Sequence, residues 1–446
     1  MNTYARDYGL VSDPERVQTA LIQQAIDDCW QSGGGIVYFD PGLYRTGTIY
    51  LRSNTCLHLP PACTLKGSDD ISDYNAGDAW PQNMIWPPEY VYGQHLIVGV
   101  EVENCGICGG GTIDGNGLHF GYRAEPDFVR PGQMVYLCEC TGVTLDDLRL
   151  VNSTYWSCFV HGCENVIITR LRIKNNAHIS NGDGIDIDTS RRVVVSDCII
   201  QTEDDCITFR CDNGFFSKLK DTSRILEDVT VTNCQLETKG CNAFRIGVGN
   251  GKIRNCQVSN IVIRNSSKGV CMESRYSFND DERPGVSIEN ISFQNIYMEC
   301  RIPVFLSSSC FGINDFAAPA IRNIRFSGLT VRAQHNIVIQ GTHNAAPENI
   351  VFRDMFLDME GVPKYEDKYG YGEWDYLTSP AAFYIANAKG VLLDGVQVNV
   401  LEEASPLKYG AVMDRAQVLF GPWRAEKCGR VIENEERDGG VPAAKD

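Results

Sequence analysis

The sequence predicts an all-β protein whose fold is a right-handed, single-stranded parallel β-helix. Short apolar strings such as TGVTLDDLRL, ENVIITRLRI and RRVVVSDCII recur along the chain. In each string β-branched residues alternate with polar ones, and Asn, Asp or Gly mark the turns, which is typical of strands joined by tight corners. The first aliphatic residue after each corner serves as an anchor, and the anchors are Val143, Val166, Val193, Val229, Ile261, Ile291, Ile324, Ile350 and Val391.

The spacing of these anchors indicates a solenoid. It begins at 23 residues, from Val143 to Val166, and reaches 41 residues without a helical period. One coil cannot bury its apolar face alone, but stacked coils can, and strands of successive coils then pair in parallel. A β-propeller is the alternative fold, but the units lack the hairpin turns that its blades need. We expect one β-helix domain over residues 1–431 and a polar, flexible tail over 432–446.

The N-terminal segment 15–35 has a different period. Its apolar residues follow helical spacing, and the glycine run 33–35 ends the pattern. These apolar residues are Val17, Leu21, Ile22 and Ile26. A helix here would cover the open end of the solenoid, where the first coil would otherwise present unpaired backbone groups. We therefore expect an N-terminal capping helix within this segment.

The chain of 446 residues carries a formal net charge of −17. Acidity of this size argues against nucleic acid or an anionic membrane as the main partner. The N-terminal MNTYARDYGL lacks a basic segment followed by an apolar run, and no apolar stretch is long enough to span a bilayer. We therefore expect a protein that is neither secreted nor inserted in a membrane.

Nineteen cysteines are scattered through apolar segments of the chain. The CGIC segment (105–108) and the CEC segment (138–140) lack a second CxxC at zinc-finger spacing, so we expect no metal and no cofactor. Free cysteine packed as a small hydrophobic residue is the interpretation that we favour. This usage predicts a reducing compartment and, with the missing secretion signal, a cytoplasmic protein.

Carboxylates gather in two neighbouring segments, NGDGIDIDTS (181–190) and TEDDCITFR (202–210). Asp183 and Asp204 are 21 residues apart, close to one short coil, and parallel strands lie about 4.8 Å apart. Inverting glycoside cleavage needs one protonated carboxyl and one carboxylate that activates water, separated by roughly 6.5–9.5 Å. A third acid, Asp205, would help to keep a proton on one member by repulsion. The alternative is a set of solvated aspartates at corners, which turns favour.

Several motifs resemble glycoside hydrolase family 28, the polygalacturonase and rhamnogalacturonase family. They are the segment from AIDDCWQSGGG to TLKGSDD, then GGGTIDGNG, NSTYWS, NGDGIDID and EDDC, in order over roughly residues 20–400. The resemblance implies a pectin-lyase-like β-helix, no cofactor and an oligosaccharide substrate of pectic or related origin. It also implies that Asp204 is the general acid, and that Asp183 and Asp205 hold the attacking water. Gly182 stands where the family usually has Thr.

The sequence departs from the family at three further positions. The family pattern has a His where Cys241 stands, and an Arg and a Lys where Cys271 and Glu273 stand. In the family the two cations bind the substrate carboxylate, so a Glu at the Lys position favours a neutral terminal sugar such as rhamnose or galactose. The acid/base aspartates remain in place.

Strand alternation predicts which side chains lie beside the aspartates. If the aliphatic and aromatic residues of these strands point inward, the polar residues between them form an exposed strip. The strip would contain Arg210, Arg245, Glu273 and Arg275, whose charged groups could orient sugar hydroxyls. Ordinary surface ion pairs are the alternative for each of them.

Three inserts, 78–95, 211–224 and 364–379, could wall a groove at this strip. Each contains aromatic residues, which stack on sugar faces, and the main candidates are Trp86 and Trp374. Closed ends would make the enzyme exo-acting on short oligosaccharides. Two other functions stay open, a catalytically inactive carbohydrate-binding β-helix and a polysaccharide lyase on the same scaffold. The sequence does not determine the oligomeric state.

Overall fold

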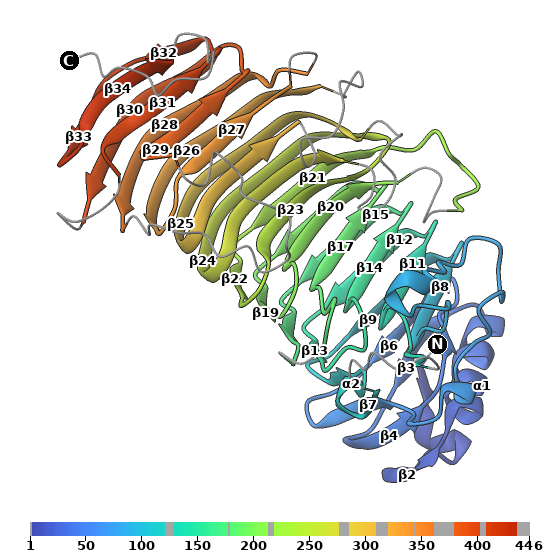
Figure 1. Cartoon of the computed structure of the whole chain (residues 1–446). Helices are drawn as coiled ribbons and strands as arrows, with labels where there is room; N and C mark the ends of the chain where they lie inside the picture. Colours follow the sequence, from blue (N-terminus) through green and yellow to red (C-terminus); the bar gives the residue numbers. More distant parts are fainter. Residues whose placement is uncertain are drawn as a thin grey trace. The chain divides into compact units, whose positions relative to one another are not determined.

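The computed structural model describes residues 2–120, 128–176, 179–212, 218–275, 285–308, 320–342, 345–360, 379–401 and 407–434. The chain divides into two compact units, Met1–Gln235 and Leu236–Asp446, and each of them is built of parallel strands (Figure 1). The predicted parallel β-helix is therefore confirmed. The last strand ends at Asn434, three residues into the predicted tail, and residues 435–446 lie outside the described part.

In the first unit the coils contribute their strands to three parallel stacks. The first stack is β1-β3-β6-β9-β12-β15-β18-β21, the second is β2-β4-β7-β10-β13-β16-β19, and the third is β5-β8-β11-β14-β17-β20. Within each coil the third-stack strand comes directly before the first-stack strand. Figure 1 shows β11, β14, β17 and β20 side by side.

The strands of the first unit are short. They are β1 (Asn2–Tyr4), β2 (Asp13–Val17), β3 (Gly35–Tyr38), β4 (Gly42–Thr46), β5 (Ile49–Tyr50), β6 (Thr55–His58), β7 (Cys63–Gly67), β8 (Ile97–Val100), β9 (Glu103–Cys108), β10 (Thr112–Asp114), β11 (Val135–Cys138), β12 (Thr141–Asp146), β13 (Arg149–Val151), β14 (Cys158–His161), β15 (Glu164–Thr169), β16 (Arg172–Lys174), β17 (Ile185–Asp188), β18 (Arg191–Ser196), β19 (Ile199–Thr202), β20 (Ile207–Cys211) and β21 (Leu226–Thr232). The β22 strand (Gln235–Thr238) begins at the last residue of this unit.

The predicted capping helix is α1 (Thr19–Gln31), and it buries Ile22, Ala25, Ile26 and Cys29. Val17 was expected on its apolar face but lies in β2 and is exposed, because the chain there still pairs with β4. The other helices are α2 (Gly117–Phe120) and the 3₁₀ helices η1 (Ala5–Tyr8), η2 (Ile71–Asp73) and η3 (Pro87–Glu89). None of the helices in the described ranges is long and apolar enough to cross a membrane.

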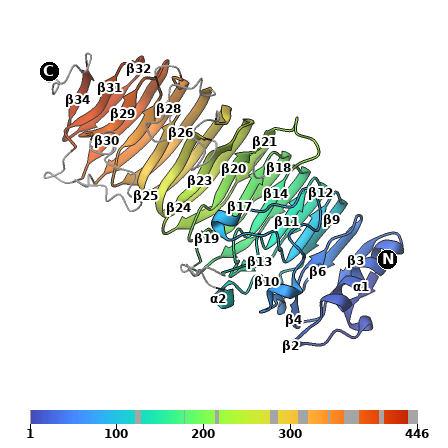
Figure 2. The same cartoon turned by 45° about the vertical axis from the view of Figure 1, so that its right-hand side comes forward.

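Several strands of the second unit are longer, because ladder pairing continues through the corners (Figure 2). They are β23 (Asn242–Gly249), β24 (Lys252–Arg275), β25 (Ser287–Ser307), β26 (Ile321–Ala333), β27 (Ile337–Gln340), β28 (Glu348–Met359), β29 (Ala381–Ala386), β30 (Val391–Val400), β31 (Tyr409–Asp414), β32 (Val418–Phe420), β33 (Trp423–Glu426) and β34 (Gly429–Asn434). Here β27 and β29 directly precede the strands that contain the anchors Ile350 and Val391, and β31 pairs with β29 in the same stack. They hold the third-stack position of this unit.

The interior of the coils contains ladders of apolar side chains in register. In the second unit Phe293, Phe326 and Phe352 are register partners, and their rings stack at centroid distances of 5.0 and 4.7 Å. The expected anchors also form ladders, with one exception. Cys256, and not Ile261, is the partner of Ile291, because a cysteine takes the place that aliphatic residues hold in the other coils.

The corners use backbone in the left-handed region, as the Asn, Asp and Gly pattern predicts. In the second unit Asn255, Asn290, Asn323 and Asn349 all have φ between 56° and 58°. Their side-chain amides also form a ladder, in which each Nδ2 donates to the Oδ1 of the preceding asparagine at 2.9–3.2 Å. Asparagine tolerates this conformation better than other residues with a Cβ, which explains its recurrence.

Candidate active site

Asp183 lies at the end of the turn that leads into β17. Asn175 holds this turn, because its Nδ2 donates to the Gly182 carbonyl at 2.9 Å and to Ser157 Oγ at 2.7 Å. Ser157 Oγ donates in turn to the Asp183 carbonyl at 2.8 Å. The NSTYWS segment, which ends at Ser157, therefore supports the backbone that carries the first aspartate.

The register between coils brings Asp183 to the backbone of Asp205. Strand β17 pairs with β20, with Ile185 opposite Ile207, so the interval between these coils is 22 residues. Gly184 N donates to the Asp205 carbonyl at 2.9 Å. A Cβ at position 184 would lie 2.4 Å from the Cys206 carbonyl oxygen, so this close approach requires glycine.

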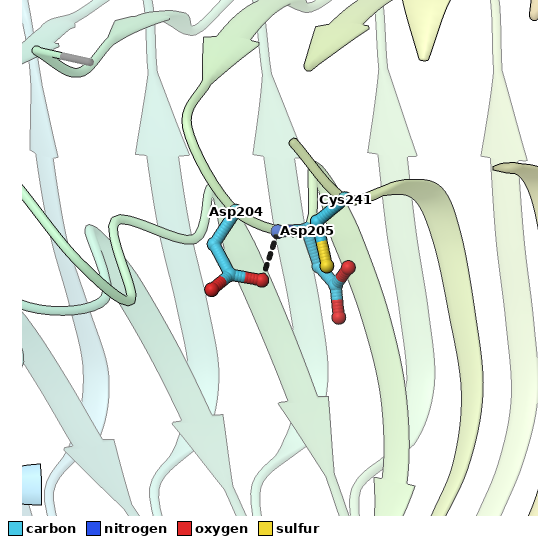
Figure 3. Close-up of side chains that lie close together, drawn as sticks. All are labelled: Asp204, Asp205 and Cys241. Carbon is cyan, nitrogen blue, oxygen red and sulfur yellow. Dashed lines mark hydrogen bonds between the residues drawn. The ribbon is translucent and has the colours of Figure 1, made fainter. Parts of the chain in front are cut away.

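Asp204 and Asp205 precede β20 and present their carboxyl groups separately (Figure 3). The Asp205 amide donates to Asp204 Oδ1 at 2.9 Å, and Thr202 Oγ1 donates to the Asp204 carbonyl at 2.6 Å. Asp204 is half-buried, whereas Asp183 and Asp205 are 5% and 8% exposed. Asp204 is therefore the member of the trio that solvent reaches most readily.

Burial and like charge act together on Asp183. Burial raises its pKa well above the usual range, and the charges of Asp204, Asp186 and Asp205 raise it further. Asp183 Oδ1 has no hydrogen-bond partner among the described residues. The structure thus brings the three predicted aspartates into one electrostatic cluster, in which Asp183 takes up a proton more readily than an ordinary aspartate.

Polar side chains also occupy the outward positions of the third stack, directly after Asp183. Asp186 pairs in register with Thr208, and Asp188 pairs with Arg210. Asp188 Oδ2 lies 3.4 Å from His161 Nδ1, and both side chains are only 2% exposed. Although burial raises the pKa of Asp188, its hydrogen bond and charge interaction with His161 bring that pKa below the usual value.

Arg210 was expected on an exposed strip, and this expectation is wrong. Its side chain is 9% exposed, with Nη1 3.8 Å from Asp186 Oδ1 and Cζ 4.4 Å above the ring of Trp156. The alternation of β20 does point Arg210 away from the core. The aromatic residue Trp156 and the insert that packs on it then cover this outward face.

The insert 78–95 packs on the outward face of β11 and β14. Met84 and Val91 join an apolar cluster with Tyr136, Tyr155, Trp156 and other residues of these coils, and Trp86 packs on this cluster half-buried. Trp86 also forms an antiparallel bridge with Val91. The insert therefore covers the outward face of β11 and β14, the strands that precede β17 in the same stack. Residues 213–217 and 364–378 of the other two inserts, including Trp374, lie outside the described residues.

The second unit brings two other candidates together. Arg245 Nη2 lies 3.0 Å from Glu273 Oε2, and the two side chains are 4% and 11% exposed. They were also expected on the exposed strip but are buried, since each satisfies the charge of the other. Cys271 contacts both members of the pair, with its Sγ 3.7 Å from Arg245 Nη1 and 3.6 Å from Glu273 Oε2. The side chain of Arg275 lies outside the described residues.

The sequence reasoning missed Asp186, Asp188, His161 and Trp156. Two of them could have been predicted, because the aspartates of GIDID alternate with isoleucine just as Arg210 of ITFR alternates with apolar residues. The strand alternation that points Arg210 away from the core therefore also points Asp186 and Asp188 outward. Within either unit by itself, the described residues contain no cluster of three His, Cys, Asp or Glu side chains spaced for a metal ion. His161 and Trp156 could not be found, because only the register brings them beside β17.

Fold and site together define a class of protein, a parallel β-helix with a cluster of carboxylates on the outward face of one stack. The sequence model of glycosyl hydrolases family 28 matches residues 88–369, more than half of the chain, and the chain belongs to this family.

Similar proteins of known name extend this result. The chain is 24% identical over 403 residues to an exo-poly-alpha-D-galacturonosidase of Dickeya chrysanthemi, covering 79% of this chain and 64% of that protein. It is 24% identical over 266 residues to the polygalacturonase QRT2 of Arabidopsis thaliana, covering 53% and 60%. The chain thus spans about three fifths of the length of these two curated relatives.

A solved structure supports the fold over nearly the whole chain. The hyperthermoactive exopolygalacturonase of Thermotoga maritima superposes with a TM-score of 0.69 at 18% identity, covering 93% of this chain and 92% of that one. At this identity the likeness concerns the fold alone, and it agrees with the predicted right-handed β-helix.

Proposed function

We propose that the protein is an inverting glycoside hydrolase in which Asp204 is the general acid and Asp183 and Asp205 activate the attacking water. The observation that carries this proposal is the Asp183–Asp205 register in a chain of family 28. Asp204, the most accessible of the three, is suited to protonate the leaving oxygen. Because burial and like charge raise the pKa of Asp183, its carboxyl would act as a base only above that raised pKa, where it is ionised.

The proposed substrate is a short oligosaccharide of pectic or related origin, cleaved from its end to release a neutral sugar. The sequence supports the neutral sugar, since Glu273 stands where the family has a Lys that binds the substrate carboxylate. Exo action is supported by the names of the Dickeya and Thermotoga proteins. The abundance of free cysteines among the described residues supports a cytoplasmic location.

Aryl glycosides test the sugar preference. Matched aryl rhamnoside, galactoside and galacturonide would be compared by kcat/KM, and we expect one of the neutral sugars to be preferred. A clear preference for the galacturonide would overturn the neutral-sugar proposal and leave the hydrolase proposal intact.

The hydrolase itself is tested with Asp204→Asn. Loss of general acid catalysis predicts a fall in kcat of about 10²–10⁴-fold. The matched control is Asp228→Asn, which changes an exposed corner aspartate of the same unit. Proton NMR of the first product would show inversion at the anomeric carbon. A retained anomer would contradict the mechanism, an unsaturated product absorbing in the ultraviolet would indicate a lyase, and binding without product would indicate an inactive carbohydrate-binding protein.

A further inference from the structure

Buried charged groups follow Asp183 on β17 and on its neighbour β20, in the third stack of the first unit. Asp186 is fully buried, and neither of its carboxylate oxygens meets a hydrogen-bond partner at the usual distance and angle among the described residues. Arg210 is the cation that faces it, at 3.8 Å. A buried carboxylate with so few partners is costly, and such groups gather where chemistry needs them.

Asp188 differs from Asp186 although it lies on the same strand. Its Oδ1 accepts hydrogen bonds from Thr189 Oγ1 at 2.7 Å and from the Asp212 amide at 3.0 Å, and its Oδ2 faces His161. Asp188 therefore has hydrogen-bond partners of its own, in addition to its charge interaction with Arg210. The guanidinium can act on Asp186 and, beyond it, on Asp183.

The position of Arg210 is set by its packing on Trp156. Its guanidinium carbon lies 4.4 Å above the ring of Trp156, which is itself stacked on Tyr155 at a centroid distance of 4.8 Å. A planar cation over an indole ring is held by electrostatic attraction as well as by contact. With 9% of its side chain exposed, Arg210 offers little surface to a sugar.

We propose that Arg210 and Asp186 are positioning residues that act on the Asp183 carboxyl through their opposite charges, and that Arg210 does not bind the substrate. This inference rests on the proposed role of Asp183 in catalysis. The two charges oppose each other at Asp183, where Asp186 favours the protonated form and Arg210 favours the ionised form. The pair would thus set the pH at which Asp183 becomes a base.

Other charged groups face these residues and remain in every variant below. Asp204 and Asp205 act on Asp183, and Asp188, Asp212 and Tyr155 act on Arg210. Because these groups are the same in every variant, a difference in the Asp183 pKa between variants is caused by the substituted residue.

The test is a pair of single variants with opposite expected signs. Arg210→Met keeps the length of the side chain but removes the charge, so the pKa of Asp183 rises and the acid limb of the pH profile of kcat moves to higher pH. Asp186→Asn removes the opposing charge, so the same limb moves to lower pH. We expect Arg210→Met to lower kcat at neutral pH by about 10- to 100-fold, with KM within about threefold of the wild type.

Two further variants guard against a merely structural effect. The double variant Arg210→Met/Asp186→Asn removes both charges, so its limb should return toward the wild-type position even if Arg210→Met alone folds poorly. Arg210→Lys keeps the charge but loses the planar stacking on Trp156, so it should keep the wild-type limb.

Titration of the Asp183 carboxyl by ¹³C NMR, with Asp183→Asn as the assignment control, gives a readout that needs no activity. Shifts of the Asp183 titration in the two opposite directions would support the positioning role, whether or not substrate is turned over. A lack of turnover would overturn only the proposed function. An unchanged titration in both single variants would overturn the positioning role. A KM raised tenfold or more in Arg210→Met at an unchanged pH profile would overturn it as well, and would assign Arg210 to the substrate.

Discussion

The outward face of the third stack differs between the two units. In the first unit this face carries Asp186, Asp188 and Arg210 under a cover of aromatic side chains. In the second unit the corresponding positions are mostly apolar, and the buried cluster there consists of Cys271, Ile302, Phe305, Val338, Ala381, Tyr384, Ala386 and Val412. The charged pair of that unit, Arg245 and Glu273, is closed at 3.0 Å.

The difference shows that the same strand geometry can serve stability or chemistry. A closed ion pair among apolar neighbours compensates its own burial, whereas Asp183 and Asp186 are buried with raised pKa values and little compensation. Such uncompensated burial reduces stability, and it is the arrangement that an acid/base site requires. Four predictions test this difference between the units.

The largest effect is expected from the interior of the second unit. Phe326→Ala removes the middle ring of the Phe293–Phe326–Phe352 stack and leaves a cavity, which should lower the free energy of unfolding by about 3–5 kcal/mol. Urea unfolding measures this change. Phe356→Ala, at a position that is 55% exposed, is the control and should change stability by less than about 0.5 kcal/mol. Equal losses in the two variants would contradict the packing argument.

The closed ion pair comes next. Glu273→Gln leaves the Arg245 guanidinium buried without its counter-charge and should cost about 2–3 kcal/mol in the same unfolding measurement. Adding Arg245→Met should recover much of the loss, because an apolar pair of similar size needs no compensation. A single variant as stable as the wild type would show that this pair does not stabilise the unit.

Asp186→Asn should have a smaller effect on stability, and one that depends on pH. Burial raises the pKa of Asp186 above that of an unfolded aspartate, about 4. Above the raised pKa the wild type bears the full cost of a buried charge. As the pH falls through that pKa toward 4, the folded state takes up a proton first, and the cost disappears. Thermal unfolding should therefore show the variant more stable than the wild type at pH 8, by about 1 kcal/mol, with the advantage lost at low pH. A variant that is less stable at both pH values would contradict this expectation.

Substitutions at the corners should change stability by a similar amount. Asn323 has φ 58° and joins the asparagine ladder, so Asn323→Ala should cost about 1–2 kcal/mol, and Asn323→Gly less. The first unit has Arg192 in the same kind of corner, at φ 54°. There Arg192→Gly should relieve the backbone but lose the hydrogen bond from Arg192 Nε to Asn165 Oδ1 at 2.7 Å, so stability should change by less than about 1 kcal/mol. If Gly and Ala were equally tolerated at position 323, the left-handed backbone would not limit the residue.

Much of the fold was accessible from the sequence because strands and corners leave local marks. Val143, Val166, Val193 and Val229 are register partners, as their spacing predicts. Cys256 was not predicted as an anchor, because a cysteine there takes a position that is aliphatic in the other coils. Val17 was assigned to the helix, although it pairs with β4. Both errors concern residues whose environment depends on a neighbouring coil.

The parallel solenoid, its asparagine corners and the three aspartates could be predicted from the chain alone, because alternation and turn chemistry are local properties. The burial of Arg210 over Trp156, the pairing of Asp188 with Arg210 across neighbouring strands, and the ion pair of Arg245 and Glu273 required the folded structure. The register between coils and the packing of an insert set these contacts, and both depend on residues that are 20 or more positions apart along the chain. The local pattern predicts which way a side chain points. Its burial and the compensation of its charge depend on which side chains of the neighbouring coil contact it.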